Sequence, residues 1–300
     1  MLRCTLRVLL ATFLSLVFSG ATVAKQRTSA EVVAESKATE WRTPQADNLM
    51  LLELDHGQVL FELAPEFAPS HIANLRKLVM DQYFDGLAII RSQDNYVVQW
   101  GDPAQEAEQK RSLGDAAESL APEFFRPAKG LAINFIESRD AYDDKVGFVR
   151  GFPVGTDGLL SWLTHCYGML GAGRGMAADS GNAAQLYVVT GHSPRHLDRN
   201  VTLLGRALSG MQHLSSLPRG TGPLGFYTDP EEHVPIKSIR VGKDIPEELR
   251  NVQIMRTDSE SFAEFVRART FRTEEWFLDP AGKIGLCNIS VPMREPPEEG

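Results

Sequence analysis

The sequence predicts a mainly β fold, a closed antiparallel β-barrel capped by two α-helices. Short apolar or alternating runs recur along the chain and are separated by turn residues, which is the pattern of strands. Only two good helical patterns occur among these runs. A sheet of many short strands is buried best when it closes on itself, because closure leaves no unpaired edge.

The first predicted elements are a hairpin, a helix and two strands. "LMLLELDHGQVLFELAP" (49–65) has two apolar runs around "DHG", which is a hairpin signal. "APSHIANLRKLVMDQY" (68–83) has helical apolar spacing. Pro69 suits its first turn, where a missing N–H costs nothing. "LAIIRSQ" (87–93) and "NYVVQWG" (95–101) are the next strands.

The second half of the barrel follows an enlarged insertion at residues 103–165. The insertion contains a charged stretch, 104–120, that we expect to be helical, and then glycine-rich, partly aromatic sequence. The later elements are strands at 185–191, 201–208 and 233–242, with a short helix at 209–217.

Both ends of the chain differ in character from the barrel. Residues 1–24 have two arginines, an apolar run of 11 residues and small residues before Ala24, the plan of a cleaved signal peptide. Residues 25–47 are polar without a period, and we expect a linker. Residues 244–300 include a predicted helix with a Thr257–Glu260 capping box. The apolar content of this extension predicts that it docks on the barrel.

The charge of the chain argues against a general nucleic-acid binder. The net charge is −8, and removal of residues 1–24 takes away two arginines and no acids, which gives −10. No basic cluster offsets this charge. The signal-peptide pattern of residues 1–24 predicts an exported protein that is periplasmic and does not span the membrane when mature. We expect this protein to be a monomer.

The two cysteines of the mature chain, Cys166 and Cys287, have two interpretations. An oxidising compartment permits them to pair, and two buried free thiols are the alternative. The sequence leaves both open.

Two other motifs do not support a cofactor or a metal ion. "GAGRG" (171–175) is followed by a loop pattern instead of the helix that a dinucleotide fingerprint requires. His192, His196 and Asp198 have ligand spacing, but Pro194 interrupts a regular helix there. We expect neither a cofactor nor a metal site.

Arg91 opens the stretch "RSQDNYVVQWGDP" (91–103), where an edge-strand arginine with its head in solvent would be the ordinary interpretation. The residues from "GQVLFELAPEFAPSHIANLRKLVMDQYFDGLAIIRSQDNYVVQWGDP" onward, however, resemble the cyclophilins, a family of peptidyl-prolyl isomerases. "AAQLYVVTGHSPRHLDRNVTLLGRALSGM" resembles the second half of the family pattern. The resemblance covers roughly residues 48–243.

The resemblance implies a catalytic role for Arg91. Amide resonance opposes rotation about an X-Pro bond with a barrier of about 18–20 kcal/mol. A guanidinium that donates a hydrogen bond to the prolyl nitrogen as it pyramidalises would stabilise the twisted state. The resemblance also implies that the substrate is a proline-containing polypeptide. The residues that would bind it are Tyr96, Val97, Gln99, Gln185, Tyr187, His196 and Leu197.

Several residues depart from the family pattern, among them Gly173 and Arg174, which stand where the family has Ala-Asn. Tyr187 replaces a phenylalanine and would add a hydroxyl to the pocket floor, His196 replaces a larger aromatic residue, and Val201 replaces a histidine. Two functions therefore remain open. One is an isomerase that assists the folding of exported proteins, and the other is a non-catalytic chaperone or scaffold that binds extended peptide.

Overall fold

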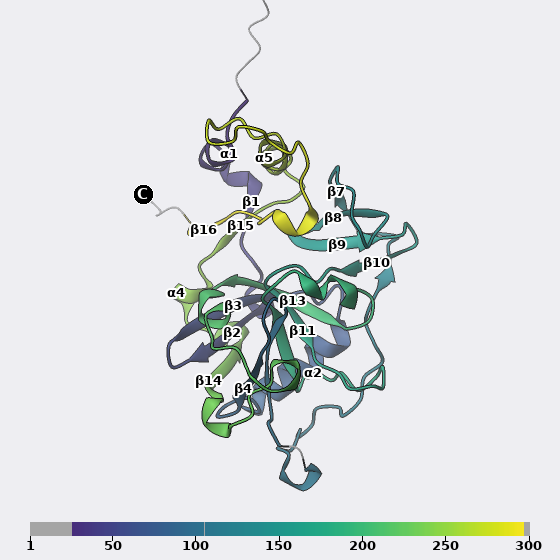
Figure 1. Cartoon of the computed structure of the whole chain (residues 1–300), viewed down its shortest axis with the longest axis vertical. Coiled ribbons are helices and arrows are strands. Elements are labelled where there is room, and N and C mark those ends of the chain that lie inside the picture. Colours follow the sequence, from purple (N-terminus) through teal and green to yellow (C-terminus); the bar gives the residue numbers. More distant parts are fainter. Residues whose placement is uncertain (1–25, 105, 297–300) are drawn as a thin grey trace, which may run out of the picture.

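The computed structural model describes residues 26–104 and 106–296 (Figure 1). The signal peptide predicted for residues 1–24 lies outside these residues. Within them, no helix combines the length and the apolar character needed to cross a bilayer.

A closed antiparallel barrel of eight strands forms the centre of the molecule, which confirms the predicted fold class. The strands follow one another around the barrel in the order β11-β12-β5-β4-β14-β2-β3-β13, and β13 pairs with β11 to close it. Their bounds are β2 Leu49–Leu54, β3 Gly57–Leu63, β4 Ala88–Ser92, β5 Val97–Gly101, β11 Met169–Ala172, β12 Leu186–Val189, β13 Leu203–Ser209 and β14 Val234–Val241.

Alternation along the strands separates two cores. Every second side chain, such as Phe61, Trp100 and Leu186, lies in the first core, inside the barrel. Helix α2 (Pro69–Met80) begins at the expected proline and adds Ile72 and Leu75 to this core. The short helix α3 (Gln212–Ser215) adds Leu214.

The insertion carries a second sheet beside the barrel (Figure 1). Its five antiparallel strands lie in the order β6-β10-β9-β8-β7. Their bounds are β6 Arg126–Pro127, β7 Asn134–Phe135, β8 Lys145–Val149, β9 Phe152–Thr156 and β10 Leu160–Leu163.

The prediction of a helix over 104–120 is wrong, because the described residues there form only the 3-10 turn η3 (Ala107–Gln109). Tertiary hydrogen bonds hold this stretch instead. The Asp102 carboxylate accepts from the backbone N–H of Arg111, whose side chain donates to the Tyr83 and Asp85 carbonyls. These long-range bonds override a local helical preference.

Residues 26–47 are packed, although their composition predicts a linker. They form α1 (Ser29–Ala34), η1 (Ala38–Glu40), β1 (Trp41–Arg42) and η2 (Ala46–Asn48, which ends one residue later). Helix α1 lies beside α5 (Glu260–Thr270) of the extension (Figure 1). The Glu40 carboxylate also accepts hydrogen bonds from Ser261. The segment is ordered by a partner that lies more than 200 residues further along the chain.

The extension completes a terminal layer, which we define as residues 26–48 and 244–296. Its other elements are η7 (Gly242–Asp244, which follows β14 directly and begins two residues before this layer), α4 Glu247–Arg250, β15 Gln253–Met255, η8 Leu286–Asn288 and β16 Met293–Arg294. Strands β1, β15 and β16 form a three-stranded sheet. The capping box expected at Thr257 is replaced by Ser259, whose hydroxyl accepts from the Phe262 N–H at 3.1 Å. Thr257 is buried and accepts from the Gly151 N–H.

A second core lies between the barrel's outer face, the insertion and the terminal layer. Leu49 and Leu51 of the barrel share it with Phe148 of the insertion and with Trp41 and Phe262 of the terminal layer. Cys166, just after β10, and Cys287 in η8 are joined by a disulfide with an S–S distance of 2.01 Å. The extension is therefore attached to the barrel both covalently and by apolar packing.

Candidate functional site

Four residues on neighbouring strands form a row across the outer face of the barrel. The register places Arg91 of β4 opposite Gln99 of β5, Gln99 opposite Tyr187 of β12, and Tyr187 opposite Gly171 of β11. Directly opposed residues in a sheet point to the same face. We refer to Arg91, Gln99, Tyr187 and Gly171 as the cross-strand row. Two of the residues that the resemblance assigns to substrate therefore lie on one line with the predicted catalytic arginine.

The Arg91 guanidinium is held by three acceptors. Its Nε donates to the Leu224 carbonyl at 2.7 Å, Nη1 donates to Gln99 Oε1 at 3.1 Å, and Nη2 donates to Gln93 Oε1. An arginine has five N–H donors, so two remain without a partner in the described part of the chain. The head group is half-buried, fixed in orientation and still able to donate to a ligand.

Aromatic rings surround this guanidinium. Its central carbon lies 5.5 Å from the centre of the Tyr96 ring and 5.1 Å from that of Phe226. Burial lowers the pKa of Arg91 from its ordinary value, but an arginine side chain stays charged in proteins. The site thus combines a permanent positive charge with apolar surroundings.

The segment 219–228 fixes Arg91 from one side and was not anticipated from the sequence. The Tyr227 N–H donates to the Ile90 carbonyl, so the segment runs along β4. Leu224, whose carbonyl holds Arg91, has a φ of 57°, which is rarely adopted by a leucine. The glycines of "RGTGPLG" (219–225) indicate a tight turn. Nothing local in the sequence indicates that this turn reaches Arg91.

Tyr96 and His196 form one edge of the site. Their rings stack with centres 5.8 Å apart and an angle of 20° between planes, and the Tyr96 hydroxyl lies 3.3 Å from His196 Nε2. Leu197, beside His196 in η4 (Ser193–Leu197), is half-buried. Val97 is only 2% exposed and belongs to the second core. It therefore supports the floor of the site more than it offers surface.

Gln185, for which the resemblance implies a substrate role, also makes a structural contact. Its Nε2 donates to the Asp102 carbonyl at 2.9 Å. A Cβ on Gly101 would lie 2.6 Å from the Gln185 side chain, so the amide lies directly against the backbone of β5. Gln185 holds the end of β5 in place.

Tyr187 is buried, and its hydroxyl does not point into the pocket. The hydroxyl lies 2.7 Å from Nε2 of His165, a fully buried residue. The expectation of a polar group on the pocket floor is therefore corrected. Sequence reasoning missed His165, because its only local signal is that it precedes Cys166.

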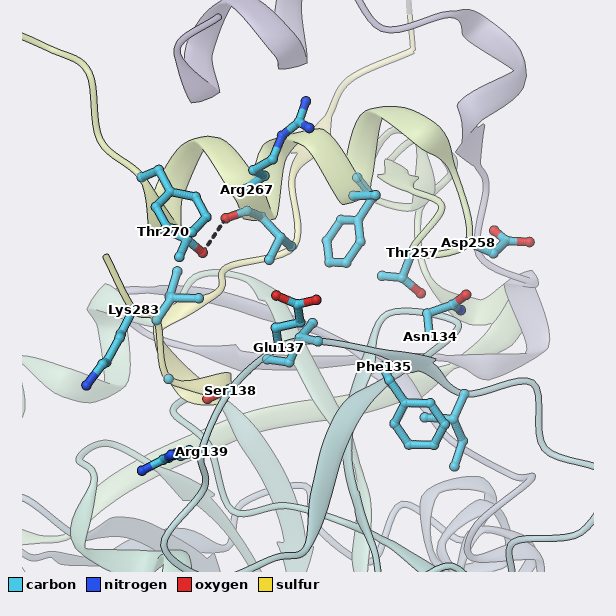
Figure 2. Close-up of a pocket in the computed structure, with 18 of the residues that line it drawn as sticks. Asn134, Phe135, Glu137, Ser138, Arg139, Thr257, Asp258, Arg267, Thr270 and Lys283 are labelled. Carbon is cyan, nitrogen blue, oxygen red and sulfur yellow. Dashed lines mark hydrogen bonds between the residues drawn. The ribbon is translucent and has the colours of Figure 1, made fainter. Parts of the chain in front are cut away.

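A separate groove lies between the insertion and the terminal layer, away from the cross-strand row. It has a volume of about 1210 Å³ and runs between the β7 segment and α5. Figure 2 shows Glu137 pointing toward the helix that carries Arg267 and Thr270. Apolar side chains line it as well: Ile133, Phe135, Phe262, Val266 and Ile284. None of the residues that line this groove belongs to the cross-strand row.

Comparisons with known proteins agree on one family. The model of the family "Cyclophilin type peptidyl-prolyl cis-trans isomerase/CLD" matches residues 49–241. A probable peptidyl-prolyl cis-trans isomerase of Brucella suis biovar 1 is 25% identical over 175 residues, which are 58% of this chain and 74% of the relative. Its counterpart in Brucella abortus is 24% identical over the same length.

A solved structure extends the likeness beyond the barrel. The cyclophilin AquaCyp293 from Hirschia baltica has a TM-score of 0.65 and 25% identity, and the match covers 91% of this chain and 99% of that one. The part of this chain that the match leaves out is shorter than either the insertion or the terminal layer. The match therefore includes parts of both.

Proposed function

This chain belongs to the cyclophilin-type peptidyl-prolyl cis-trans isomerase family, and its reaction is rotation about X-Pro bonds; we propose that Arg91 drives this rotation in exported polypeptides. The names of the Brucella relatives favour the isomerase over the non-catalytic scaffold that the sequence had left open.

The arrangement of Arg91 carries the proposal. Rotation needs neither a nucleophile nor a cofactor, only an interaction that is stronger in the twisted amide than in either planar form. As the amide twists, the prolyl nitrogen loses resonance and becomes a hydrogen-bond acceptor. Arg91 has two N–H groups left for that nitrogen after its bonds to Leu224, Gln99 and Gln93. Because these three acceptors fix the guanidinium beforehand, little reorganisation is required when the nitrogen pyramidalises.

The apolar surroundings provide a place for the proline ring. The faces of Tyr96 and Phe226 flank the Arg91 guanidinium. In a site of low polarity, a charge-assisted hydrogen bond is stronger than in water. The substrate class that this combination fits is a polypeptide segment with an accessible X-Pro bond.

Export is the second part of the proposal. Residues 1–24 have the composition of a secretory signal peptide, and the disulfide between Cys166 and Cys287 is compatible with an oxidising compartment. We therefore infer that the mature protein works in the periplasm on newly exported, incompletely folded chains. Uncatalysed X-Pro isomerisation takes tens of seconds or more, so such chains would benefit from a catalyst.

A protease-coupled isomerisation assay on a short Ala-Pro peptide tests Arg91. We expect Arg91→Ala to lose roughly 100- to 1000-fold in kcat/KM, the usual effect of removing one oriented donor to a transition state. Arg91→Lys should not restore activity, because an ammonium group cannot engage the three acceptors and the substrate together. Arg256→Ala is the matched control, since Arg256 is an exposed arginine of the terminal layer paired with Asp258. Wild-type turnover in folded Arg91→Ala protein would refute the assignment.

A further inference from the structure

A chain of hydrogen bonds runs from Tyr187 through His165 and Asp198 to Arg195, which pairs with Asp140 of the insertion. The Tyr187 hydroxyl meets His165 Nε2 at 2.7 Å, and the two rings are nearly parallel with centres 6.1 Å apart. His165 Nδ1 lies 2.8 Å from Asp198 Oδ1. Arg195 donates from Nε to Asp198 Oδ2 at 2.7 Å and also pairs with Asp140.

The chain assigns the donor and acceptor roles of His165. The Asp198 carboxylate accepts from the backbone N–H of His165 as well as from its ring, and Arg195 keeps this carboxylate charge-paired. Nδ1 must therefore carry the ring proton, which leaves Nε2 as the acceptor for the Tyr187 hydroxyl. Burial lowers the pKa of His165, in agreement with a neutral ring.

The position of the Tyr187 ring is defined on its other side by Gly171. A Cβ at position 171 would lie 2.3 Å from Cζ of Tyr187, so only glycine leaves room for the ring there. The ring is thus held between the bare backbone of β11 and the imidazole of His165. Across the sheet, Tyr187 is directly opposite Gln99, whose amide oxygen holds Arg91.

We propose that His165 is a positioning residue of the isomerase site, which fixes Tyr187 and through it the cross-strand row. The proposal rests on the proposed function of Arg91. His165 touches neither the expected substrate nor Arg91, and it acts by satisfying a buried hydroxyl. Without this acceptor the hydroxyl would lose its partner, because the rest of the Tyr187 side chain is buried among apolar residues. The ring would then shift toward a new partner and disturb Gln99.

A mutant cycle between positions 165 and 187 tests the proposal. The variants are His165→Leu, which removes the acceptor, Tyr187→Phe, which removes the hydroxyl, the double variant, and His165→Gln, whose amide oxygen can accept from the hydroxyl. Displacement of Tyr187 and Gln99 would misplace the Arg91 guanidinium, and a misplacement of about 1 Å can cost about 100-fold in rate. We therefore expect His165→Leu to lose roughly 5- to 100-fold in kcat/KM. The double variant should recover most of this loss, and His165→Gln should recover part of it.

A role in packing alone predicts a different pattern, in which the losses of the single variants multiply and the double variant is the worst. That pattern would overturn the proposal, as would full activity of folded His165→Leu. Folding of each variant is checked by near-ultraviolet circular dichroism. Turnover that does not depend on Arg91 would refute the proposed function instead, so the two failures are distinguishable.

A measurement on the wild-type protein keeps the proposal testable if the position 165 variants do not fold. With ¹⁵N-labelled histidine, the His165 ring should show a protonated Nδ1 and a hydrogen-bonded Nε2, and the Nε2 resonance should move in Tyr187→Phe. Titration with an Ala-Pro peptide should also shift it. A resonance that the peptide leaves unchanged would overturn the link between His165 and the site.

Discussion

The disulfide between Cys166 and Cys287 should be a major source of stability, because it closes a long loop. The two cysteines are 121 residues apart. In the chain-entropy model, a loop of this length removes about 16 cal/mol/K from the unfolded state, or about 5 kcal/mol at 25 °C. Losses of about 2–5 kcal/mol are typical when a native disulfide is removed. A domain of this kind has only about 5–15 kcal/mol of net stability.

Urea unfolding with and without a thiol reductant measures this contribution. The wild-type protein in its disulfide-bonded form should lose about 2–5 kcal/mol in the free energy of unfolding on reduction. The variant Cys166→Ser/Cys287→Ser should match the reduced wild type, and reductant should not change it. Two free thiols in denatured wild-type protein, or equal unfolding free energies with and without reductant, would refute the reasoning.

Two further predictions concern the surroundings of the site. Burial raises the pKa of Asp143 to about 6, so the folded state retains this proton at pH values where the unfolded carboxyl has lost it. As the pH rises from about 4 to about 6, the wild type should therefore lose about 1–3 kcal/mol of stability relative to Asp143→Asn. Urea unfolding across that range measures the difference, and parallel curves would contradict this. Gly171→Ala should cost about 1–3 kcal/mol and lower kcat/KM, because its Cβ would overlap the Tyr187 ring. Gly175→Ala, in an exposed loop with 3.5 Å to its nearest neighbour, is the control and should change neither quantity, whereas equal effects of both substitutions would argue against the steric reason.

The sequence predicted the barrel because each strand's own alternation reports which side faces the core. The runs around Phe61 and Trp100 are predicted and found as barrel strands. Arg91 and Gln99 could be placed together because the spacing of a known family carried the information. Tyr96 and His196 likewise lie side by side as the resemblance implies.

The parts that could not be predicted depend on partners far away in the chain. Residues 26–47 look like a linker until Val32 and Trp41 meet the extension in the second core. The stretch around Arg111 has helix-forming residues but is held by the carbonyls of Tyr83 and Asp85. His165 belongs to the site only through contacts with Asp198 and Tyr187, and no spacing rule connects these three positions.

The terminal layer has a consequence for the order in which the chain folds. Glu40 bonds to Ser261 across 221 positions of the sequence. At a synthesis rate of about 5–20 residues per second, the first partner waits roughly 10–45 s for the second to be made. During most of this interval the barrel itself is incomplete, because β14 (Val234–Val241) is made only shortly before Ser261. Trp41, Leu49 and Leu51 therefore still lack their partners in the second core. Uncatalysed proline isomerisation occupies the same range of times, so this chain, with its 17 prolines, begins as an incompletely folded polypeptide of the kind that we propose it serves.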